Sequence, residues 1–226
     1  MKVFTTFLQA LRRKLNPANP EQFEPVSKVF GMDRGTPVDR YYIEKFLEEN
    51  KQYIKGKVLE IADSTYSRKF GSDVISFEIL HATGDNPKAT ITGDLTKIET
   101  LPSGNVDCFI CTQTFNFIYN FQDAIKGAYH LLKPGGVILA TVAGITQISG
   151  YDMQRWGDYW RFTTASAQKA FEESFKPGNI SVDYYGNCYV ATSFLKGLCV
   201  EELKKEYLDM KAADYPVIVT IVAKKI

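Results

Sequence analysis

Three acidic side chains occur at or near the ends of successive predicted strands. Glu60 ends an apolar strand over 58–61, Glu78 lies near the end of a strand over 74–80, and Asp94 follows a short strand over 90–92. The ligand crevice of an open α/β sheet lies at the carboxyl ends of its parallel strands, so we expect these carboxylates at one edge. The pattern indicates a site for a nucleotide-like cofactor.

The elements that would position these residues form a βαβ series between 57 and 142. Further apolar strands are predicted over 106–111 and 137–142, the second as a continuous run typical of a strand covered on both faces. A helix is expected to begin near Asn120 and to end at Gly135-Gly136, because glycine favours helix C-termini. The β-branched run after Tyr215-Pro216 predicts a closing strand. We therefore expect an α/β fold.

Composition narrows the class of protein. The chain has 226 residues, 45% of them apolar, and a net charge of +1, which suits one sizeable core and argues against a nucleic-acid binder. Cys108 and Cys111 lie in a strand-like run, where a three-residue offset points their side chains to opposite faces, so no metal site is expected. No disulfide framework is apparent among four cysteines, which favours a reducing, cytoplasmic location. We see neither a signal peptide nor a run approaching the roughly 18 apolar residues of a membrane span.

The N-terminal 29 residues are expected to form an amphipathic helix and a linker, followed by one domain over 30–226. Phe4, Phe7, Leu8, Leu11 and Leu15 recur at helical spacing, and Asn16-Pro17 would stop the helix. This apolar face either packs on its own domain or docks on something else, such as a second copy, a partner or a membrane surface.

A charged turn precedes the next predicted helix. Thr36 is expected as its N-cap and Pro37 as its first residue. The charges before it either cap the helix and face solvent, or belong to a flap over a ligand, with Arg34 or Arg40 facing a carboxylate.

The segment after the fifth strand, AGITQISGYDMQRWGDYWRFT, is rich in aromatic and charged residues and contains both tryptophans of the chain. Loops of this composition on a rigid scaffold often contact substrates.

Four sequence stretches together resemble class I S-adenosylmethionine-dependent methyltransferases: VLEIADSTY, TGDL, VDCFICTQTF and HLLKPGGVILATV. The resemblance covers roughly 30–226 and implies a Rossmann-like, doubly wound, seven-stranded and mostly parallel sheet, with an antiparallel last strand and helices on both faces. More narrowly, GMDRGTPVDRYYIEKFL with WGDYWRFT is similar to a bacterial group of methyltransferases associated with glycan and polysaccharide biosynthesis.

The first loop departs from the family pattern, E/D-x-G-x-G-x-G. Residues 60–66 contain no glycine, and Ala62, Ser64 and Tyr66 stand at the three glycine positions. Glycines there let the backbone turn tightly and approach the cofactor. The bulk of Tyr66 therefore leaves open a methyltransferase-like binding or scaffolding protein without turnover. A nicotinamide-dependent oxidoreductase is disfavoured, because it would need a glycine-rich turn at this point.

The resemblance implies a role for each matched residue. Glu60 and the 62–64 backbone would meet the amino-acid part of S-adenosylmethionine, Glu78 the ribose, and Asp94 with Leu95 the adenine. Thr112 and Gln113 would lie beside the methyl group. The expected cofactor-binding residues are Glu60, Ala62, Asp63, Ser64, Glu78, Asp94, Leu95, Thr112 and Gln113.

The expected reaction is metal-independent O-methylation of a sugar, a glycan or another small hydroxylated metabolite. Nucleic acid is disfavoured as acceptor, because Thr112-Gln113-Thr114-Phe115 replaces the Asn/Asp-Pro-Pro-aromatic run of amino-methylating relatives. Asp158 is the first candidate for the base that takes the hydroxyl proton, with Asp152 and His81 as weaker ones. Alternatively, Asp158 forms an ion pair with Arg155 or Arg161. The expected substrate-binding residues are Arg34, Tyr41, Tyr42, Trp156, Tyr159, Trp160 and Arg161.

Overall fold

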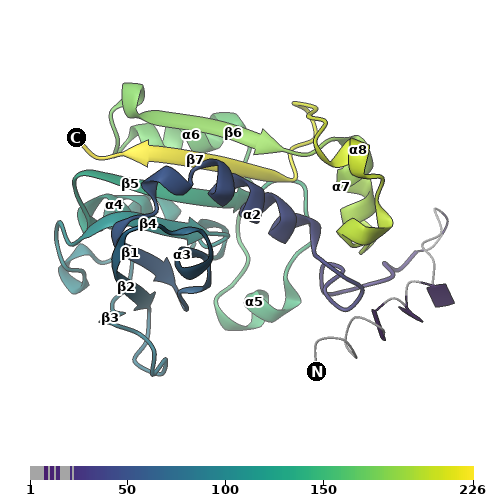
Figure 1. The fold of residues 1–226 in the computed structure, drawn as a ribbon, viewed down its shortest axis with the longest axis horizontal. Helices are drawn as coiled ribbons and strands as arrows, with labels where there is room; N and C mark the ends of the chain where they lie inside the picture. The colour runs from purple at the N-terminus through teal and green to yellow at the C-terminus, as the bar shows by residue number, and fades with distance from the viewer. Residues whose placement is uncertain (1–7, 10, 13, 16–20, 22) are drawn as a thin grey trace.

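The computed structural model describes residues 8, 9, 11, 12, 14, 15, 21 and 23–226. Its centre is a seven-stranded sheet with the strand order β3-β2-β1-β4-β5-β7-β6 (Figure 1). All neighbouring strands pair in parallel except β7, which runs antiparallel to both β5 and β6. The strands are β1 (Gly56–Ile61), β2 (Val74–His81), β3 (Ile91–Thr92), β4 (Val106–Thr112), β5 (Leu132–Ala143), β6 (Ile180–Tyr185) and β7 (Ile218–Lys224). The fold class predicted from the sequence is confirmed.

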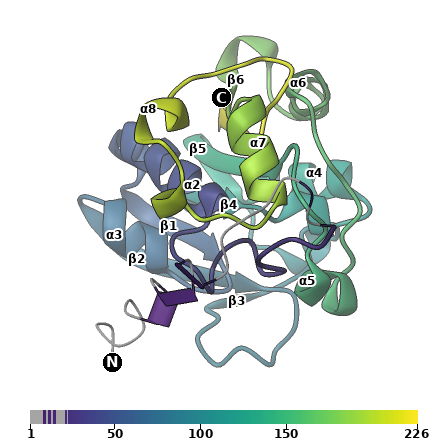
Figure 2. The same cartoon turned by 90° about the vertical axis from the view of Figure 1, so that its right-hand side faces the viewer.

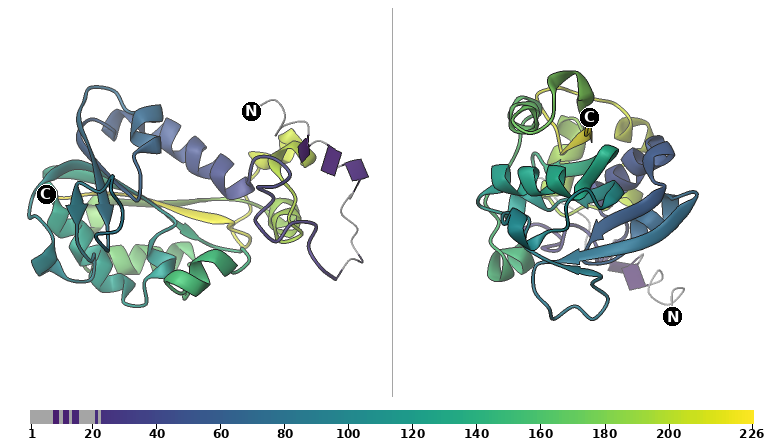
Figure 3. Two further views of the ribbon diagram at one scale, coloured as in Figure 1. Left: turned by 90° about the horizontal axis from the view of Figure 1, so that it is seen from below. Right: turned by 90° about the vertical axis from the view of Figure 1, so that its left-hand side faces the viewer.

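Helices cover both faces of this sheet (Figure 3). One apolar cluster joins α4 and α6 to one face, and a second joins α2, α3, α7 and α8 to the other. The central strands β4 and β5 contribute to both clusters, which explains their continuous apolar sequences. The helices are α2 (Val38–Glu49), α3 (Thr65–Phe70), α4 (Phe121–Leu131), α5 (Gly150–Arg155), α6 (Thr164–Glu172), α7 (Cys188–Leu195) and α8 (Lys205–Leu208).

Several predicted boundaries are wrong. Helix α4 ends at Leu131, and Gly135, with φ of +83°, lies within the range of β5 instead of capping the helix. The N-cap of α2 is Pro37, and Thr36 instead bonds the Glu201 carboxylate through both its backbone N–H and its hydroxyl. Local capping rules did not predict the contact of Thr36, because Glu201 is distant in the sequence.

A strap of residues 23–37 runs beside α7 before the chain enters α2 (Figure 2). The backbone N–H of Val26 donates to the Lys196 carbonyl at 2.9 Å, and Gly31, with φ of +77°, lies so close to Leu198 that a Cβ would be 2.9 Å from its carbonyl oxygen. The strap therefore requires glycine at this close approach.

The predicted N-terminal helix lies partly outside the described residues, since Phe4 and Phe7 are not among them. Leu8, Leu11 and Leu15 are helical and exposed. Arg12 forms a 3.1 Å ion pair with Asp33 in the strap. No helix within the described part of the chain is both long and apolar enough to cross a membrane.

Candidate active site

The turn after β1 is organised by the buried carboxylate of Glu60. Its Oε2 accepts the backbone N–H of Tyr66 at 3.0 Å, and its Oε1 accepts that of Ser67 at 2.7 Å together with the Ser67 hydroxyl. Burial raises the pKa of Glu60, although these three hydrogen bonds favour its charged form. Glu60 therefore holds the first turn of α3.

Ala62 gives this turn its direction. It adopts φ of +67°, a conformation that costs a non-glycine residue on the order of 1 kcal/mol. Two contacts hold it: its N–H donates to the Leu80 carbonyl at 3.0 Å, and its carbonyl accepts the Asn86 amide at 2.8 Å. The glycine-free sequence thus forms the left-handed turn, with hydrogen bonds to β2 and to the loop after it compensating for the strain.

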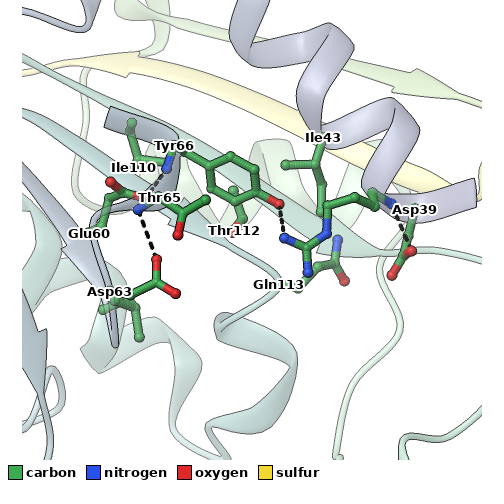
Figure 4. A pocket seen from close by; sticks show the side chains of 11 residues that line it. Asp39, Ile43, Glu60, Asp63, Thr65, Tyr66, Ile110, Thr112 and Gln113 are labelled. Atoms are coloured by element: carbon green, nitrogen blue, oxygen red, sulfur yellow. Dashed lines mark hydrogen bonds between the residues drawn. The ribbon is translucent and has the colours of Figure 1, made fainter. Parts of the chain in front are cut away.

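Tyr66 points from α3 toward the N-terminal end of α2 (Figure 4). The phenol oxygen accepts a 2.7 Å hydrogen bond from Nη1 of Arg40, and the ring lies beside Phe70. Burial raises the pKa of Tyr66 to about 12, so the hydroxyl stays protonated at neutral pH. The large residue at the third glycine position thereby connects the loop to α2.

A cavity of about 250 Å³ lies between this turn, the carboxyl end of β4 and α2 (Figure 4). Its walls carry both signs of charge, because Arg40 and the acidic residues Asp39, Glu60 and Asp63 all line it. Burial raises the pKa of Asp39. The lining residues are Asp39, Arg40, Ile43, Glu60, Ile61, Asp63, Thr65, Tyr66, Ile110, Thr112 and Gln113. Asp39 was missed by sequence reasoning, because its place depends on where α2 crosses the sheet.

Thr112 and Gln113 line the cavity where β4 ends. Gln113 has φ of +48°, and its N–H donates to the Thr141 carbonyl of β5 at 2.8 Å. This contact fixes the strained residue, because the neighbouring strand over-determines its backbone. The polar end of β4 is thus held rigidly against the space below α2.

Glu78 lies three residues before the end of β2, within the strand. Its carboxylate is 3.7 Å from the Lys57 ammonium, and a hydrogen bond from Thr90 is the main cause that lowers its pKa. The residue that ends β2 is His81, whose Nδ1 is 2.9 Å from the Thr83 carbonyl. Glu78 is not among the cavity residues, and its role at the ribose stays a prediction.

Asp94 and Leu95 also lie outside the cavity lining. The Asp94 carboxylate accepts the backbone N–H and hydroxyl of Thr96, at 2.9 and 2.8 Å. Leu95 is buried, and its carbonyl lies against Gly127 of α4, where a Cβ would be only 2.0 Å away. In this structure both residues shape the turn after β3.

Asp158 is buried and held by three donors. Its carboxylate accepts hydrogen bonds from both terminal nitrogens of Arg161, at 2.5 and 2.9 Å, and from the Ser149 N–H at 2.9 Å. Of the two sequence interpretations, the structure therefore favours the ion pair with Arg161 over a free base. Arg155 instead lies over the ring of Tyr151.

The aromatic candidates separate by exposure. Trp156 and Tyr159 are about half exposed, and Trp156 meets His81 edge-on with ring centroids 6.2 Å apart. Trp160 is partly buried and donates from its indole N–H to the Tyr119 carbonyl at 3.1 Å. Trp156 and Tyr159 are therefore the aromatic candidates with the most surface free for a ligand.

Tyr41 and Tyr42 do not line the cavity. Tyr42 is fully buried, stacks on Tyr185 with ring centroids 5.1 Å apart, and donates to the Leu208 carbonyl at 2.8 Å. Tyr41 is partly buried and meets Tyr42 edge-on. Tyr42 thus belongs to the core in this structure.

Arg34 is 1% exposed and forms two hydrogen bonds with the Glu202 carboxylate, at 3.0 Å from Nε and 2.5 Å from Nη2. This pair joins the strap to the segment after α7. The carboxylate that Arg34 faces is thus one of the chain's own.

Asn116, in the turn after β4, was not singled out from the sequence. Its carbonyl accepts the N–H groups of Tyr159 and Trp160, at 2.9 and 3.2 Å. Its buried Oδ1 has no hydrogen-bond partner within the described part of the chain. Asn116 thus connects the end of β4 to the aromatic loop.

No group of three or more potential metal ligands occurs among the described His, Cys, Asp and Glu residues. Cys108 and Cys111 are buried thiols whose pKa values are raised by burial, the second to about 12. They are neutral at physiological pH and pack in the two apolar clusters.

Residues 53–140 match the family model of a methyltransferase domain. The matched segment contains β1 to β4 and most of the cavity-lining residues. A comparison with curated protein sequences finds no significant match.

Solved structures of S-adenosylmethionine-dependent methyltransferases share this fold. One from Archaeoglobus fulgidus has a TM-score of 0.51 and 13% identity, covering 82% of this chain and 94% of that one. One from Thermotoga maritima, described as a possible histamine N-methyltransferase, has a TM-score of 0.52 and 14% identity, covering 82% and 93%. Phosphoethanolamine N-methyltransferase 2 of Haemonchus contortus, solved with S-adenosyl-L-methionine, has a TM-score of 0.54 and 12% identity, covering 97% of this chain and 56% of that one.

These comparisons support S-adenosylmethionine as the cofactor, as the sequence predicted. The donor set fits one end of that molecule, because a zwitterionic amino-acid group needs both a cation and a carboxylate nearby, and the cavity offers both. At about 250 Å³ it is smaller than the roughly 300–1,000 Å³ of pockets that enclose whole ligands of drug size. The cavity therefore suits part of the cofactor.

Proposed function

We propose that this chain transfers a methyl group from S-adenosylmethionine to a hydroxyl of a sugar, a glycan or another small hydroxylated metabolite, without a metal. The observation that carries the proposal is the cavity of mixed charge at the carboxyl ends of β1 and β4. Ligands of open α/β sheets bind at such ends. The match of residues 53–140 to a methyltransferase domain supports the same reaction class.

The residues that would hold the cofactor lie in two groups. Asp63 and the backbone of Ala62 and Ser64 would lie beside its amino-acid end, with Glu60 holding their turn in place. Thr112 and Gln113 would lie nearer the transferred methyl group.

At the ribose, we propose His81 in place of Glu78, because His81 ends β2 at the ligand edge. If Nδ1–H donates to the Thr83 carbonyl, Nε2 is left as an acceptor for a ribose hydroxyl. Asp94 and Leu95 would act at the adenine only through the turn that they shape.

The cofactor would supply a methyl group on an already activated leaving group. The protein then has to orient the acceptor hydroxyl and exclude water. Trp156 and Tyr159 would cover the acceptor, because their rings are exposed in the loop after β5. Asp158 and Arg161 would position this loop through their ion pair. The sequence similarity to a group associated with glycan biosynthesis favours a sugar face under these rings.

A second candidate is a binding module without turnover. Tyr66 favours it, because its buried ring occupies a position where related loops have glycine. Titration with S-adenosylmethionine tests whether the chain binds this cofactor. An assay of methyl transfer then distinguishes the enzyme from the module.

The first experiment is isothermal titration of the full chain with S-adenosylmethionine and S-adenosylhomocysteine. We expect micromolar binding of both. A panel of sugars, nucleotide sugars and glycans is then incubated with the protein and S-adenosylmethionine. Mass spectrometry of the products detects an added methyl group. Absence of binding would refute the enzyme and favour a non-catalytic module, and binding without transfer to any acceptor would also favour the module.

A further inference from the structure

Arg40 is a cation beside the cavity whose charge is not balanced by an ion pair within the described residues. Its guanidinium donates one hydrogen bond, from Nη1 to the Tyr66 phenol oxygen at 2.7 Å, and lies 5.5 Å from the centroid of that ring; both residues line the cavity. A guanidinium carries five N–H donors in a planar fork that suits a carboxylate. Four of them thus remain for a ligand.

The turn after β1, by contrast, has used most of its backbone donors within the chain. In a glycine-rich loop such N–H groups would be free to approach an anionic ligand. Here they donate to protein oxygens: Ala62 to Leu80, Asp63 to Ile61, Thr65 to the Asp63 side chain, and Tyr66 and Ser67 to Glu60. The turn therefore offers an incoming carboxylate little besides the negative charges of Glu60 and Asp63, which would repel it.

We propose that Arg40 of α2, instead of the backbone of the first loop, binds the α-carboxylate of the cofactor's amino-acid end. The carboxylates of Asp39 and Asp63 face the α-ammonium group of the same end. This inference rests on the proposed function, since it assigns the subsite of that cofactor. The cavity's size suits this end alone, and the acidic side chains of Asp39 and Asp63 complement the ammonium as Arg40 complements the carboxylate.

Tyr66 is a positioning residue in this arrangement. Its protonated phenol holds one nitrogen of Arg40 without neutralising the charge, so the guanidinium is oriented before the ligand arrives. The bulky residue at the third glycine position thereby becomes part of the recognition of the ligand. A phenylalanine here would keep the ring beside Arg40 and remove the hydrogen bond that fixes one of its nitrogens.

The test compares two ligands that differ only at the amino-acid end. S-adenosylhomocysteine carries the α-carboxylate and α-ammonium, and 5′-methylthioadenosine lacks both. Isothermal titration of each is carried out on the wild type, on Arg40→Gln and on Lys126→Gln. Lys126 lies on α4, pairs with Asp123 and is outside the cavity, so its variant controls for the loss of one positive charge.

For Arg40→Gln we expect S-adenosylhomocysteine to bind roughly 10- to 100-fold more weakly, the loss of a charge-assisted hydrogen bond. Binding of 5′-methylthioadenosine should change by less than about 3-fold, the scatter expected when no contact is lost. Arg40→Lys should give an intermediate loss, because an ammonium keeps the charge without the fork. Tyr66→Phe should weaken S-adenosylhomocysteine less than Arg40→Gln does.

Three outcomes would overturn the proposal. Unchanged binding of S-adenosylhomocysteine to Arg40→Gln would refute it while leaving the proposed function intact. If Arg40→Gln binds both ligands more weakly by the same factor, Arg40 supports the structure of the site and does not contact the amino-acid end. Absence of binding to the wild type would refute the proposed function together with this inference. Thermal unfolding of each variant checks that it is folded.

Discussion

The loops after β1 and β5 lie at the same edge of the sheet but use their charged residues in opposite ways. In the first, residues 61–66, the backbone is tied to Glu60 and to β2, and charged side chains face a cavity. In the second, residues 144–163, the charges of Asp158 and Arg161 neutralise each other and aromatic rings are exposed. Charged side chains thus line a cavity in the first loop, whereas in the second they pair with each other and hold the loop.

The largest effect on stability is expected for Glu60→Ala in the first loop. Two buried backbone N–H groups, those of Tyr66 and Ser67, would lose their acceptor, and each costs roughly 1–3 kcal/mol. We expect the free energy of unfolding to fall by about 3 kcal/mol in urea denaturation. Glu60→Gln, which keeps an acceptor oxygen, should lose clearly less. Equal losses in both variants would show that the carboxylate does not hold the turn.

In the second loop the corresponding change is Asp158→Ala. Breaking a buried ion pair costs about 3–5 kcal/mol, and the partial exposure of Arg161 reduces this to about 2 kcal/mol. Binding of S-adenosylhomocysteine should remain within about 3-fold of the wild type, because Asp158 is not among the residues that line the cavity. Arg155→Gln is the matched control, since Arg155 packs on Tyr151 without an ion pair to Asp158. If Asp158→Ala is as stable as this control, the ion pair does not support the loop.

Two residues of β2, His81 and Glu78, can be compared by their effect on the affinity for S-adenosylhomocysteine. His81→Ala should weaken S-adenosylhomocysteine about 10-fold, which corresponds to about 1.4 kcal/mol, through loss of a hydrogen bond to the ribose. Glu78→Ala should leave the affinity within about 3-fold, because its carboxylate contacts Lys57 inside the strand. The reverse result would return Glu78 to the ribose and exclude His81.

The smallest effect is a pH dependence of stability. Burial raises the pKa of Glu60 in the folded chain above its unfolded value of roughly 4.3. The contribution of Glu60 to the free energy of unfolding is therefore complete below that value and declines as pH rises through the folded pKa. The stability of the wild type relative to Glu60→Gln should fall over this range in urea titrations. A difference that rises with pH would contradict the direction of the shift.

The sequence predicted the sheet well because its strands are continuous apolar runs, as in β4 and β5, whose burial does not depend on details elsewhere. Thr112 and Gln113 directly follow such a strand, so the sequence indicates where they lie, while their role beside the methyl group stays a prediction. The contacts of Glu78 and Arg34 could not be predicted, because their partners, Lys57 and Glu202, are set by strand register and by the path of the strap. Asp39 was missed for a similar reason: only the crossing of α2 over the sheet brings it to the cavity.

The position of β7 has a consequence for how the protein is made. This strand is the last in the sequence, yet it lies inside the sheet between β5 and β6. During synthesis, β5 has its β4 partner long before residues 218–224 exist, so one edge of a very apolar strand is open until they emerge. The nascent chain therefore passes through a stage that is prone to pairing with the wrong strand, and it is protected only when translation reaches β7.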